Sequence, residues 1–367
     1  MLNPVDILRV CIGEKTVGRL AIAPDRRCVF EYDAEWIETG FSISPFYLPL
    51  QSGAFTARSD PFGGLFGVFS DSLPDGWGNL LLDRLLIREG IRPGTLTPLD
   101  RLSIVGSSGM GALTYHPENQ LSSGEDNADL NYLAGEVEKI LNEENSGDLE
   151  LLFRKNGSSG GARPKVLITV DGQHWLVKFR SSYDPKDIGT IEYKYSLAAK
   201  KCSIDMPETK LFEGKYFGVR RFDREGDIRY HVHTAGGLLY ANHRLPSLDY
   251  TDLMKATLIL TRNMEEVAGM YRLMVFNVLS GNKDDHAKNF SFLFKNGIWH
   301  LSPAYDLVPN DGFNGNHCTT INGKGNPERE DMLEAAKNAG FPKKKAQLIY
   351  DEIYSGIGLT YYNDSRM

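Results

Sequence analysis

The chain has 367 residues, of which 41% are hydrophobic and 24% are charged, and this composition is typical of a globular protein with two or three structural units. Its formal net charge of -7 argues against a free-standing nucleic-acid binder, but not against a protein that reaches DNA through a partner. The four cysteines form no C-x-x-C pair, so neither a structural zinc site nor a disulfide framework is expected.

No segment of the chain predicts a membrane or secretion signal. The N-terminal residues lack the unbroken apolar run of a signal peptide. The most apolar helix candidate, residues 264–280, contains Glu265, Glu266 and Arg272 and is too polar for a membrane span. We therefore expect a cytoplasmic protein that does not bind membranes.

The first third of the chain predicts a small β-rich subdomain at residues 1–117. Residues 5–50 alternate short apolar runs with turn residues, and a Gly/Pro-rich stretch then leads into a helix that begins near Gly76. A polar, acidic linker is expected at 118–129, followed by a helix over 130–143.

The remaining patterns predict a β-containing domain at 118–222 and a helical domain at 223–367. Strands are expected in KVLITV and HWLVKFR as a hairpin, and at 209–213 and 216–222, with a helix at 188–202. Later helices are predicted at 249–261, 264–280, 328–339 and 343–355, interrupted by the strand pair FSFLF and IWHLS. This is an α+β arrangement, and it is also the layout of a bilobal, protein-kinase-like fold with a helical C-lobe.

The densest polar motif is GNKDDHAKNFSFLF at residues 281–294, in which Asp284 precedes Asn289 by five positions. Phosphoryl transfer requires an acceptor for the substrate hydroxyl proton and oxygen ligands for magnesium, and this spacing matches the D-x-x-x-x-N of kinase catalytic loops. His286 and Lys288 lie between the two. We assign Asn289 and His286 to nucleotide binding, and Lys288 to catalysis, where its cation would offset charge on the phosphoryl group.

A second carboxylate follows the strand pair. Asp306 lies in LSPAYDLVPN, where kinases place a further magnesium ligand. The alternatives are that Asp306 caps a helix or shapes a turn, and that the 281–294 motif is only a charged turn. Asp285 is the weaker candidate for the base, because it lies four rather than five positions before Asn289.

Upstream, Lys178 lies within the apolar strand WLVKFR, where an unpaired lysine is costly to bury unless it binds a phosphate. The alternative is an edge-strand lysine that faces solvent. Glu192, on the next predicted helix, is a candidate to orient Lys178 or a solvated helix charge.

A Gly/Ser-rich segment, NGSSGGARPK at residues 156–165, opens the hairpin. Its paired glycines, Gly160 and Gly161, allow backbone N–H groups to approach an anion closely, which indicates a phosphate-binding loop. Ser158 and Ser159 precede them. The segment matches neither G-x-G-x-x-G nor a Walker A loop, and such turns are often simple connections.

Taken together, these motifs resemble the HipA family, the kinase toxins of bacterial toxin–antitoxin pairs. The resemblance covers nearly the whole chain and occurs in order, through VGRLAIA, FEYDAEWIETG, FGGLFGVFSDSLPDGWG, SSGGARPK, WLVKF, GVRRFDR, HTAGGLL, GNKDDHAKNFSF and SPAYDL. SDSLPDGWG and DDHAKN are the most specific of these segments. The chain is short for such a protein, so its C-terminal helices are expected to be trimmed.

The resemblance implies a protein serine/threonine kinase that uses ATP and Mg2+. It implies Asp284 as the catalytic base, Asn289 and Asp306 as magnesium ligands, and Lys178 on the ATP phosphates. It also implies a hinge beside the adenine, formed by backbone groups of Arg220, Arg221 and Phe222. Relatives with an acidic residue in place of Arg220 leave a contact through that side chain open.

The resemblance further implies regulation and partners. Ser158 falls on the family's inhibitory autophosphorylation site, with Ser159 as the alternative. A HipB-like helix-turn-helix antitoxin would bind the protein and bring it to operator DNA. No sequence motif identifies the protein substrate, although some family members phosphorylate aminoacyl-tRNA synthetases. Two other functions stay open: a small-molecule kinase, which would not explain residues 1–117, and an inactive pseudokinase that only docks an antitoxin.

Overall fold

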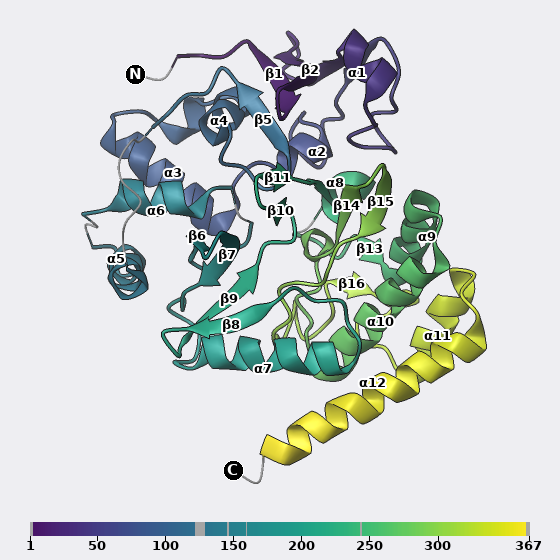
Figure 1. Ribbon diagram of the computed structural model, residues 1–367. Helices are drawn as coiled ribbons and strands as arrows, with labels where there is room; N and C mark the ends of the chain where they lie inside the picture. Colours follow the sequence, from purple (N-terminus) through teal and green to yellow (C-terminus); the bar gives the residue numbers. More distant parts are fainter. Residues whose placement is uncertain (1–2, 122–128, 145–146, 159, 243, 365–367) are drawn as a thin grey trace. The chain divides into compact units, whose positions relative to one another are not determined.

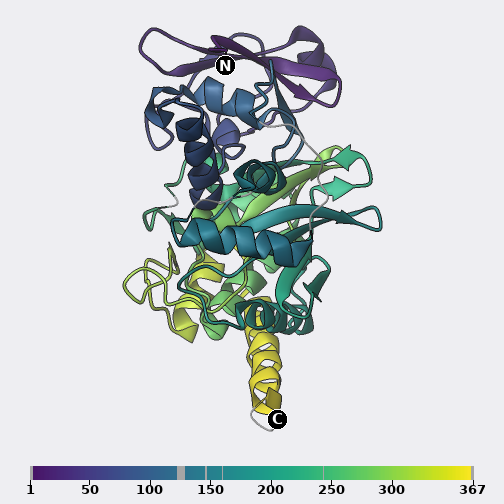
Figure 2. The same cartoon turned by 90° about the vertical axis from the view of Figure 1, so that its left-hand side faces the viewer.

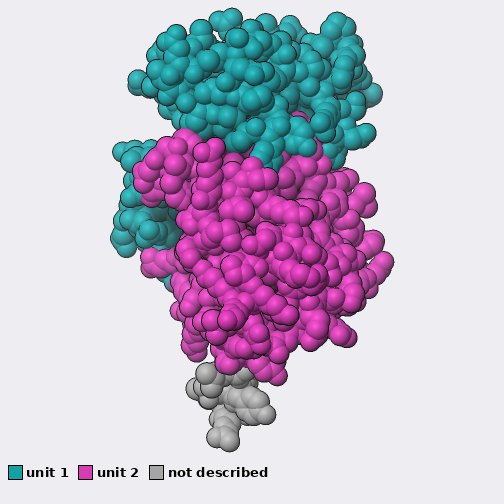
Figure 3. All heavy atoms as spheres, turned by 90° about the vertical axis from the view of Figure 1, so that its right-hand side faces the viewer, with its two compact units in different colours: residues 1–190, 210–232 teal, residues 191–209, 233–367 magenta. Residues whose placement is uncertain are grey.

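The computed structural model describes residues 3–121, 129–144, 147–158, 160–242 and 244–364, with side chains described as far as residue 357. The chain divides into two compact units, residues 1–190 with 210–232 and residues 191–209 with 233–367 (Figure 3). Both units contain helices and strands, which confirms the predicted α+β class. No helix of the described residues is both long and apolar enough to cross a bilayer.

The first unit begins with a five-stranded sheet in the order β4-β3-β2-β1-β5 (Figure 1). In β1, Leu8 and Val10 are buried whereas Ile7 and Arg9 are exposed, the two-residue period of a strand with one face on a core. The strands are β1 (Ile7–Ile12), β2 (Lys15–Ile22), β3 (Cys28–Tyr32), β4 (Ala54–Thr56) and β5 (Leu113–His116). The helices beside them, which the sequence did not predict, are α1 (Ala34–Thr39), α2 (Gly67–Ser70), η1 (Pro93–Thr95) and α4 (Pro98–Val105).

A second sheet, in the order β6-β7-β9-β8, shares its core with helices of the same unit. On α5, Leu133, Val137 and Ile140 recur at helical spacing and are buried against Trp175 of β7. The strands are β6 (Lys165–Val170), β7 (Gln173–Lys178), β8 (Thr209–Phe212) and β9 (Tyr216–Arg220), followed by the short pair β10 (Arg224–Glu225) and β11 (Ile228–Arg229). The helices are α3 (Gly76–Arg88), α5 (Leu130–Leu141) and α6 (Leu149–Asn156). The predicted hairpin and both predicted helices are confirmed.

The second unit is mainly helical and is built around α10, which packs against α9, α11 and α12. Its elements are α8 (Ala235–Leu239), α9 (Tyr250–Thr261), α10 (Met264–Ser280), η2 (Ala287–Asn289), α11 (Arg329–Asn338) and α12 (Lys343–Asp364), the last a single long helix in Figure 2. Three strands form a sheet in the order β12 (His231–Thr234), β14 (Ser291–Lys295), β15 (Ile298–Leu301), and β13 (Leu248–Asp249) pairs with β16 (Thr319–Thr320). The chain passes between the units three times, within α7 (Ile188–Lys201), at the start of β8 and within β12.

Candidate functional site

The predicted site residues fall into two groups, one in each unit. The first unit contains Ser158, Gly160, Gly161, Lys178, Arg220, Arg221 and Phe222. The second unit contains Glu192, Asp284, His286, Lys288, Asn289 and Asp306. Ser159 lies outside the described residues.

In the second unit, the polar motif forms a compact loop between the end of α10 and β14. The helix ends at Gly281, whose left-handed backbone and N–H bonds to the last turn direct the chain out of the helix. Eight residues later, the Nδ2 atom of Asn289 donates to the backbone oxygen of Asp284 at 2.6 Å. This bond closes the loop and brings Asp284 and Asn289 together, independently of the Asp284 carboxylate.

His286 stabilises the short helix η2 within this loop. Its Nδ1 atom accepts the backbone N–H of Lys288 at 3.2 Å. The backbone oxygen of His286 also accepts the N–H of Asn289 at 2.8 Å. His286 therefore shapes the turn that carries Lys288 and Asn289.

Asp285 differs sharply from its neighbour Asp284, because it is bonded into the core. It is only 1% exposed, whereas Asp284 is half-buried. Its carboxylate accepts bonds from the Tyr250 hydroxyl at 2.9 Å, His317 Nδ1 at 2.8 Å and the Cys318 N–H at 2.9 Å. All of these donors come from α9 or from the segment before β16. Asp285 thus fixes the loop to its own unit.

A buried hydrogen-bond chain continues from Asp285 into α10. Asn282 donates to Asn277 at 3.0 Å, and Asn277 donates to the Tyr250 hydroxyl at 2.9 Å. Burial and the nearby Asp285 charge raise the pKa of Tyr250 well above its usual value, so the phenol remains a donor to Asp285. The loop is therefore anchored to α10 through Asn282 and to α9 through Asp285.

Asp306 lies on a segment that is bonded to the same loop. The neighbouring Tyr305 hydroxyl donates to the backbone oxygen of Lys288 at 2.7 Å. Further along, Asn310 accepts the Lys283 N–H at 3.2 Å and forms a parallel bridge with Asn282. Asp306 has φ +59°, an uncommon conformation for a residue with a side chain, and such strain concentrates at functional positions.

These contacts join the segment that carries Asp306 to the loop that carries Asp284 and Asn289, all within the second unit. Carboxylate and amide oxygens are the hard ligands that Mg2+ prefers, and Mg2+ usually takes one or two protein groups, with water or phosphate completing the shell. Among the described residues, no three or more His, Cys, Asp or Glu side chains gather into a metal site. Two carboxylates and one amide on these two segments are a donor set that suits an ion whose remaining ligands are water or phosphate.

In the first unit, the Gly/Ser-rich segment is packed closely against two other parts of the unit. The backbone N–H of Trp77, at the start of α3, donates to the Gly161 oxygen at 3.2 Å. A side chain at Gly160 would meet the Asp75 carboxylate at 3.1 Å. The SDSLPDGWG motif therefore supports the glycine-rich turn, which explains a sequence feature that had no assigned role.

Lys178 is the last residue of β7, is buried, and lies directly opposite Lys165 of β6. Lys165 is also buried, and its ammonium group donates to the Gly160 oxygen. The hairpin register thus places two buried lysines side by side at the end of β7 that adjoins the Gly/Ser-rich segment. The sequence prediction missed Lys165, although counting the hairpin register back from Lys178 would have found it.

The segment predicted as a hinge connects β9 to β10. Arg221 is buried, its guanidinium binds the Asp223 carboxylate through two bonds of 2.9 and 2.7 Å, and its backbone N–H donates to the His174 oxygen at 2.8 Å. The backbone N–H and the guanidinium of Arg221 thus both have hydrogen-bond partners within the protein. The contact of Arg220, Arg221 and Phe222 with adenine stays a prediction.

Comparison with known proteins gives matches along most of the chain. A curated Sinorhizobium fredii protein named "Putative kinase Y4dM" is 26% identical, over 95% of this chain and 84% of that protein. A Haemophilus influenzae protein named "Putative kinase" is 25% identical, over 41% of this chain and 52% of that protein.

Among solved structures, a chain of the Shewanella oneidensis toxin–antitoxin complex of HipA, HipB and operator DNA has a TM-score of 0.73 at 19% identity, over 97% of this chain and 90% of that chain. This likeness confirms the predicted fold. The family model of the HipA N-terminal domain matches residues 8–116, and that of the HipA-like C-terminal domain matches residues 157–358. The chain therefore belongs to the HipA family.

Proposed function

We propose that this protein is an ATP- and Mg2+-dependent protein serine/threonine kinase that acts as the toxin of a toxin–antitoxin pair. The observation that supports the proposal is that the segment of Asp306 is bonded to the loop of Asp284 and Asn289, in which Asp285 is bonded into the core. Membership of the HipA family and two relatives named as kinases support the same activity.

In this proposal, the Asp284 carboxylate accepts the proton of the substrate hydroxyl, and Lys288 offsets charge on the transferring phosphoryl group. Asn289 and Asp306 would hold Mg2+ on the ATP phosphates. When bound, the ion neutralises charge on the phosphate oxygens. The Asn289 side chain donates to the Asp284 backbone through Nδ2, so its amide oxygen is the atom suited to a cation.

In the first unit, we assign the ATP phosphates to the loop at 156–165 and to the buried pair Lys165 and Lys178, and the adenine to the hinge at Arg220 to Phe222. The glycines supply backbone N–H groups, and the two lysines supply positive charge beside them. Lys165 is an addition to the residues that the sequence suggested. His286 belongs to the nucleotide site in this proposal through its support of η2.

Ser158 is the proposed inhibitory autophosphorylation site. Its side chain is only 2% exposed and accepts a hydrogen bond, so phosphate transfer requires the loop to leave the conformation described here. A phosphoserine adds roughly -1.5 to -2 charge and would repel the nucleotide phosphates. The loop would then exchange between a conformation that binds ATP and a displaced, phosphorylated one.

Mg-ATP is expected to stabilise the protein against thermal unfolding, because a ligand that binds only the folded state adds about 2.7 kcal/mol at 100 times its dissociation constant. The shift in Tm should shrink when Mg2+ is chelated or when Asp306 is replaced by asparagine. Differential scanning fluorimetry with ATP, and with ATP plus EDTA, measures both effects. A Tm unaffected by Mg-ATP at millimolar concentration would rule out the nucleotide site.

We further propose a HipB-like antitoxin as partner and operator DNA as a target reached through it, as in the Shewanella oneidensis complex. Because the chain carries a net charge of -7, it should not bind operator DNA by itself at physiological salt. Adding the antitoxin encoded beside it should produce a larger DNA complex that contains both proteins. Electrophoretic mobility shifts with each component alone and together test this, and tight operator binding by the isolated chain would contradict it.

A further inference from the structure

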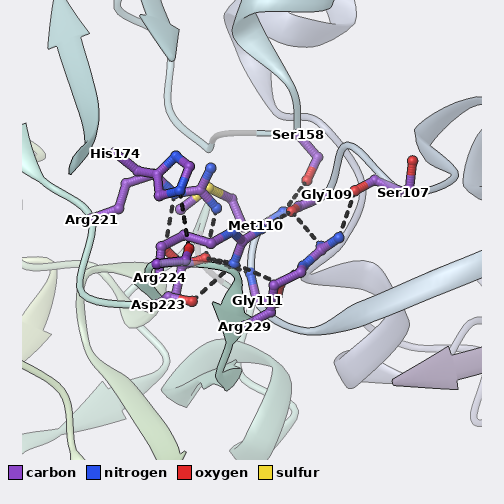
Figure 4. A network of polar contacts seen from close by, with 11 residues as sticks. Ser107, Gly109, Met110, Gly111, Ser158, His174, Arg221, Asp223, Arg224 and Arg229 are labelled. Atoms are coloured by element: carbon purple, nitrogen blue, oxygen red, sulfur yellow. Dashed lines mark hydrogen bonds and ion pairs between the residues drawn. The ribbon is translucent and has the colours of Figure 1, made fainter. Parts of the chain in front are cut away.

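A loop at residues 107–111, here called the docking loop, connects α4 to β5 and is held by arginines from a distant part of the sequence (Figure 4). The Arg229 guanidinium donates to three backbone oxygens, those of Ser107, Gly109 and Gly111, at 2.7 to 3.0 Å. Arg224 donates to the oxygens of Gly109 and Gly111, both at 2.9 Å. The docking loop has no regular secondary structure, so these bonds replace a strand or helix ladder.

A single carboxylate completes this arrangement. Asp223 is 1% exposed and accepts the Gly111 N–H at 2.8 Å, Arg224 at 2.7 Å and the two bonds from Arg221. We call Arg221, Asp223, Arg224 and Arg229 the arginine cluster. Burial lowers the pKa of Arg224 to about 9, which still leaves it cationic at neutral pH. Charge-assisted bonds of this kind are roughly twice as strong as neutral ones.

The docking loop in turn contacts the start of the phosphate loop. The Met110 N–H donates to Ser158 Oγ at 2.9 Å. Next to Ser158, Gly157 has φ +56°, and a Cβ atom there would lie 2.9 Å from the Ser108 oxygen. The two backbones therefore meet so closely that only glycine fits at position 157.

We propose that Asp223, Arg224 and Arg229 are positioning residues for nucleotide binding, which hold the docking loop as the surface on which Ser158 docks and so fix the phosphate loop in its binding conformation. This rests on the proposed function, in which residues 156–165 bind the ATP phosphates. A glycine-rich loop loses much conformational entropy when it is ordered. Ordering it before the nucleotide arrives removes that cost from the binding step.

The same geometry gives Ser158 phosphorylation a physical consequence. Ser158 is only 2% exposed, and its Oγ atom accepts the Met110 N–H at 2.9 Å, so a phosphoryl group on Oγ does not fit the docked conformation. A phosphate on Oγ therefore displaces Ser158 from the Met110 N–H. The docking loop, still bound by the arginine cluster, remains in place, so the phosphate loop is the part that moves.

A double-mutant cycle on ATP affinity tests the positioning role. Arg229→Ala should raise the Kd for Mg-ATP about tenfold, while its kcat at saturating ATP changes by less than about twofold, and Ser158→Ala should raise the Kd about threefold. If Arg229 acts through Ser158, the double variant should show about a tenfold rise rather than the product of the two. Arg229→Lys keeps the charge but cannot reach all three oxygens, so its Kd should be intermediate.

Amide hydrogen exchange at Met110 tests the docking contact without any nucleotide. Ser158→Ala, and wild-type protein phosphorylated on Ser158, should both exchange this amide about tenfold faster than the unmodified protein. Arg92→Ala, an exposed arginine of the same unit, is the matched control and should alter neither exchange nor ATP affinity.

Each contrary result has a separate meaning. Independent, multiplicative effects of Arg229→Ala and Ser158→Ala on the Kd would overturn the positioning role. Continued protection of Met110 in the phosphorylated protein would show that the docked state accommodates the phosphate, which contradicts the displacement. If the Met110 amide exchanges at the same rate in Ser158→Ala as in the wild type, the proposed docking contact between Met110 and Ser158 is ruled out. Absence of Mg-ATP binding by the wild type would instead overturn the proposed function, while exchange at Met110 would still decide whether Ser158 docks.

Discussion

Asp284→Asn should reduce phosphate incorporation into the protein, and into its substrate, by about a thousandfold, because the amide cannot accept the proton of the attacking hydroxyl. The loop should keep its shape, since the bond that closes it runs from Asn289 to the backbone oxygen of Asp284 and not to the carboxylate. Incubation with labelled Mg-ATP, followed by phosphosite mapping by mass spectrometry, measures the loss at Ser158.

Two companion variants separate the roles of the carboxylates. Asp306→Asn should also lose most activity, with a partial recovery at high Mg2+ that Asp284→Asn does not show, because only Asp306 is assigned to the ion. Asp311→Asn alters an exposed carboxylate close to the same segment and should retain full activity. If Asp306→Asn retains full phosphotransfer, the assignment of Asp306 as a magnesium ligand is wrong. Comparing the phosphoproteomes of cells that express wild type and Asp284→Asn would then identify the protein substrate.

Asp285→Asn is expected to destabilise the second unit by about 3 to 5 kcal/mol, the usual effect of removing one partner from a buried, charged hydrogen-bond group. An asparagine presents an N–H group towards donors that now bind a carboxylate, so the contacts from His317 and Cys318 cannot all be satisfied. Urea-dependent hydrogen exchange of amides in α10 measures the stability of this unit separately from the other.

The contrast with Asp284→Asn makes this prediction informative about the base. Asp284 is half-buried and its side chain is not among the donors and acceptors of the Asp285 group, so Asp284→Asn should alter stability by no more than about 1 kcal/mol. If Asp285→Asn folds with normal stability but is inactive, whereas Asp284→Asn retains phosphotransfer, the base is Asp285 and the assignment is displaced by one residue.

The sequence predicts the elements of this fold well where burial has a simple period. The apolar positions Leu133, Val137 and Ile140 predict α5 to within two residues of its end, and the short run of apolar and β-branched residues in KVLITV predicts β6. The short helices α1 and α2 escape prediction, because four to six residues are too few to display a helical period. Their position depends on the core of the neighbouring sheet instead.

Within the candidate site, local spacing finds the residues that act as a motif but not those that support it. Asp284 and Asn289 are five residues apart, and a loop closed by one hydrogen bond can be inferred from that spacing. The partners of Asp285 lie 32 to 35 residues away, and Asp223 and Gly111 are 112 residues apart. Such contacts depend on how distant segments meet in the folded unit, which a single sequence does not record.

The close approach of Gly157 to the Ser108 oxygen also constrains how this family can vary. A methyl group at position 157 would occupy the space that the docking loop fills, and the left-handed backbone there would be strained as well. Relatives that carry a larger residue at the equivalent of 157 should therefore have a docking loop that is shorter or follows another path. Substitutions in these two segments, which are far apart in the chain, should then be inherited together rather than independently.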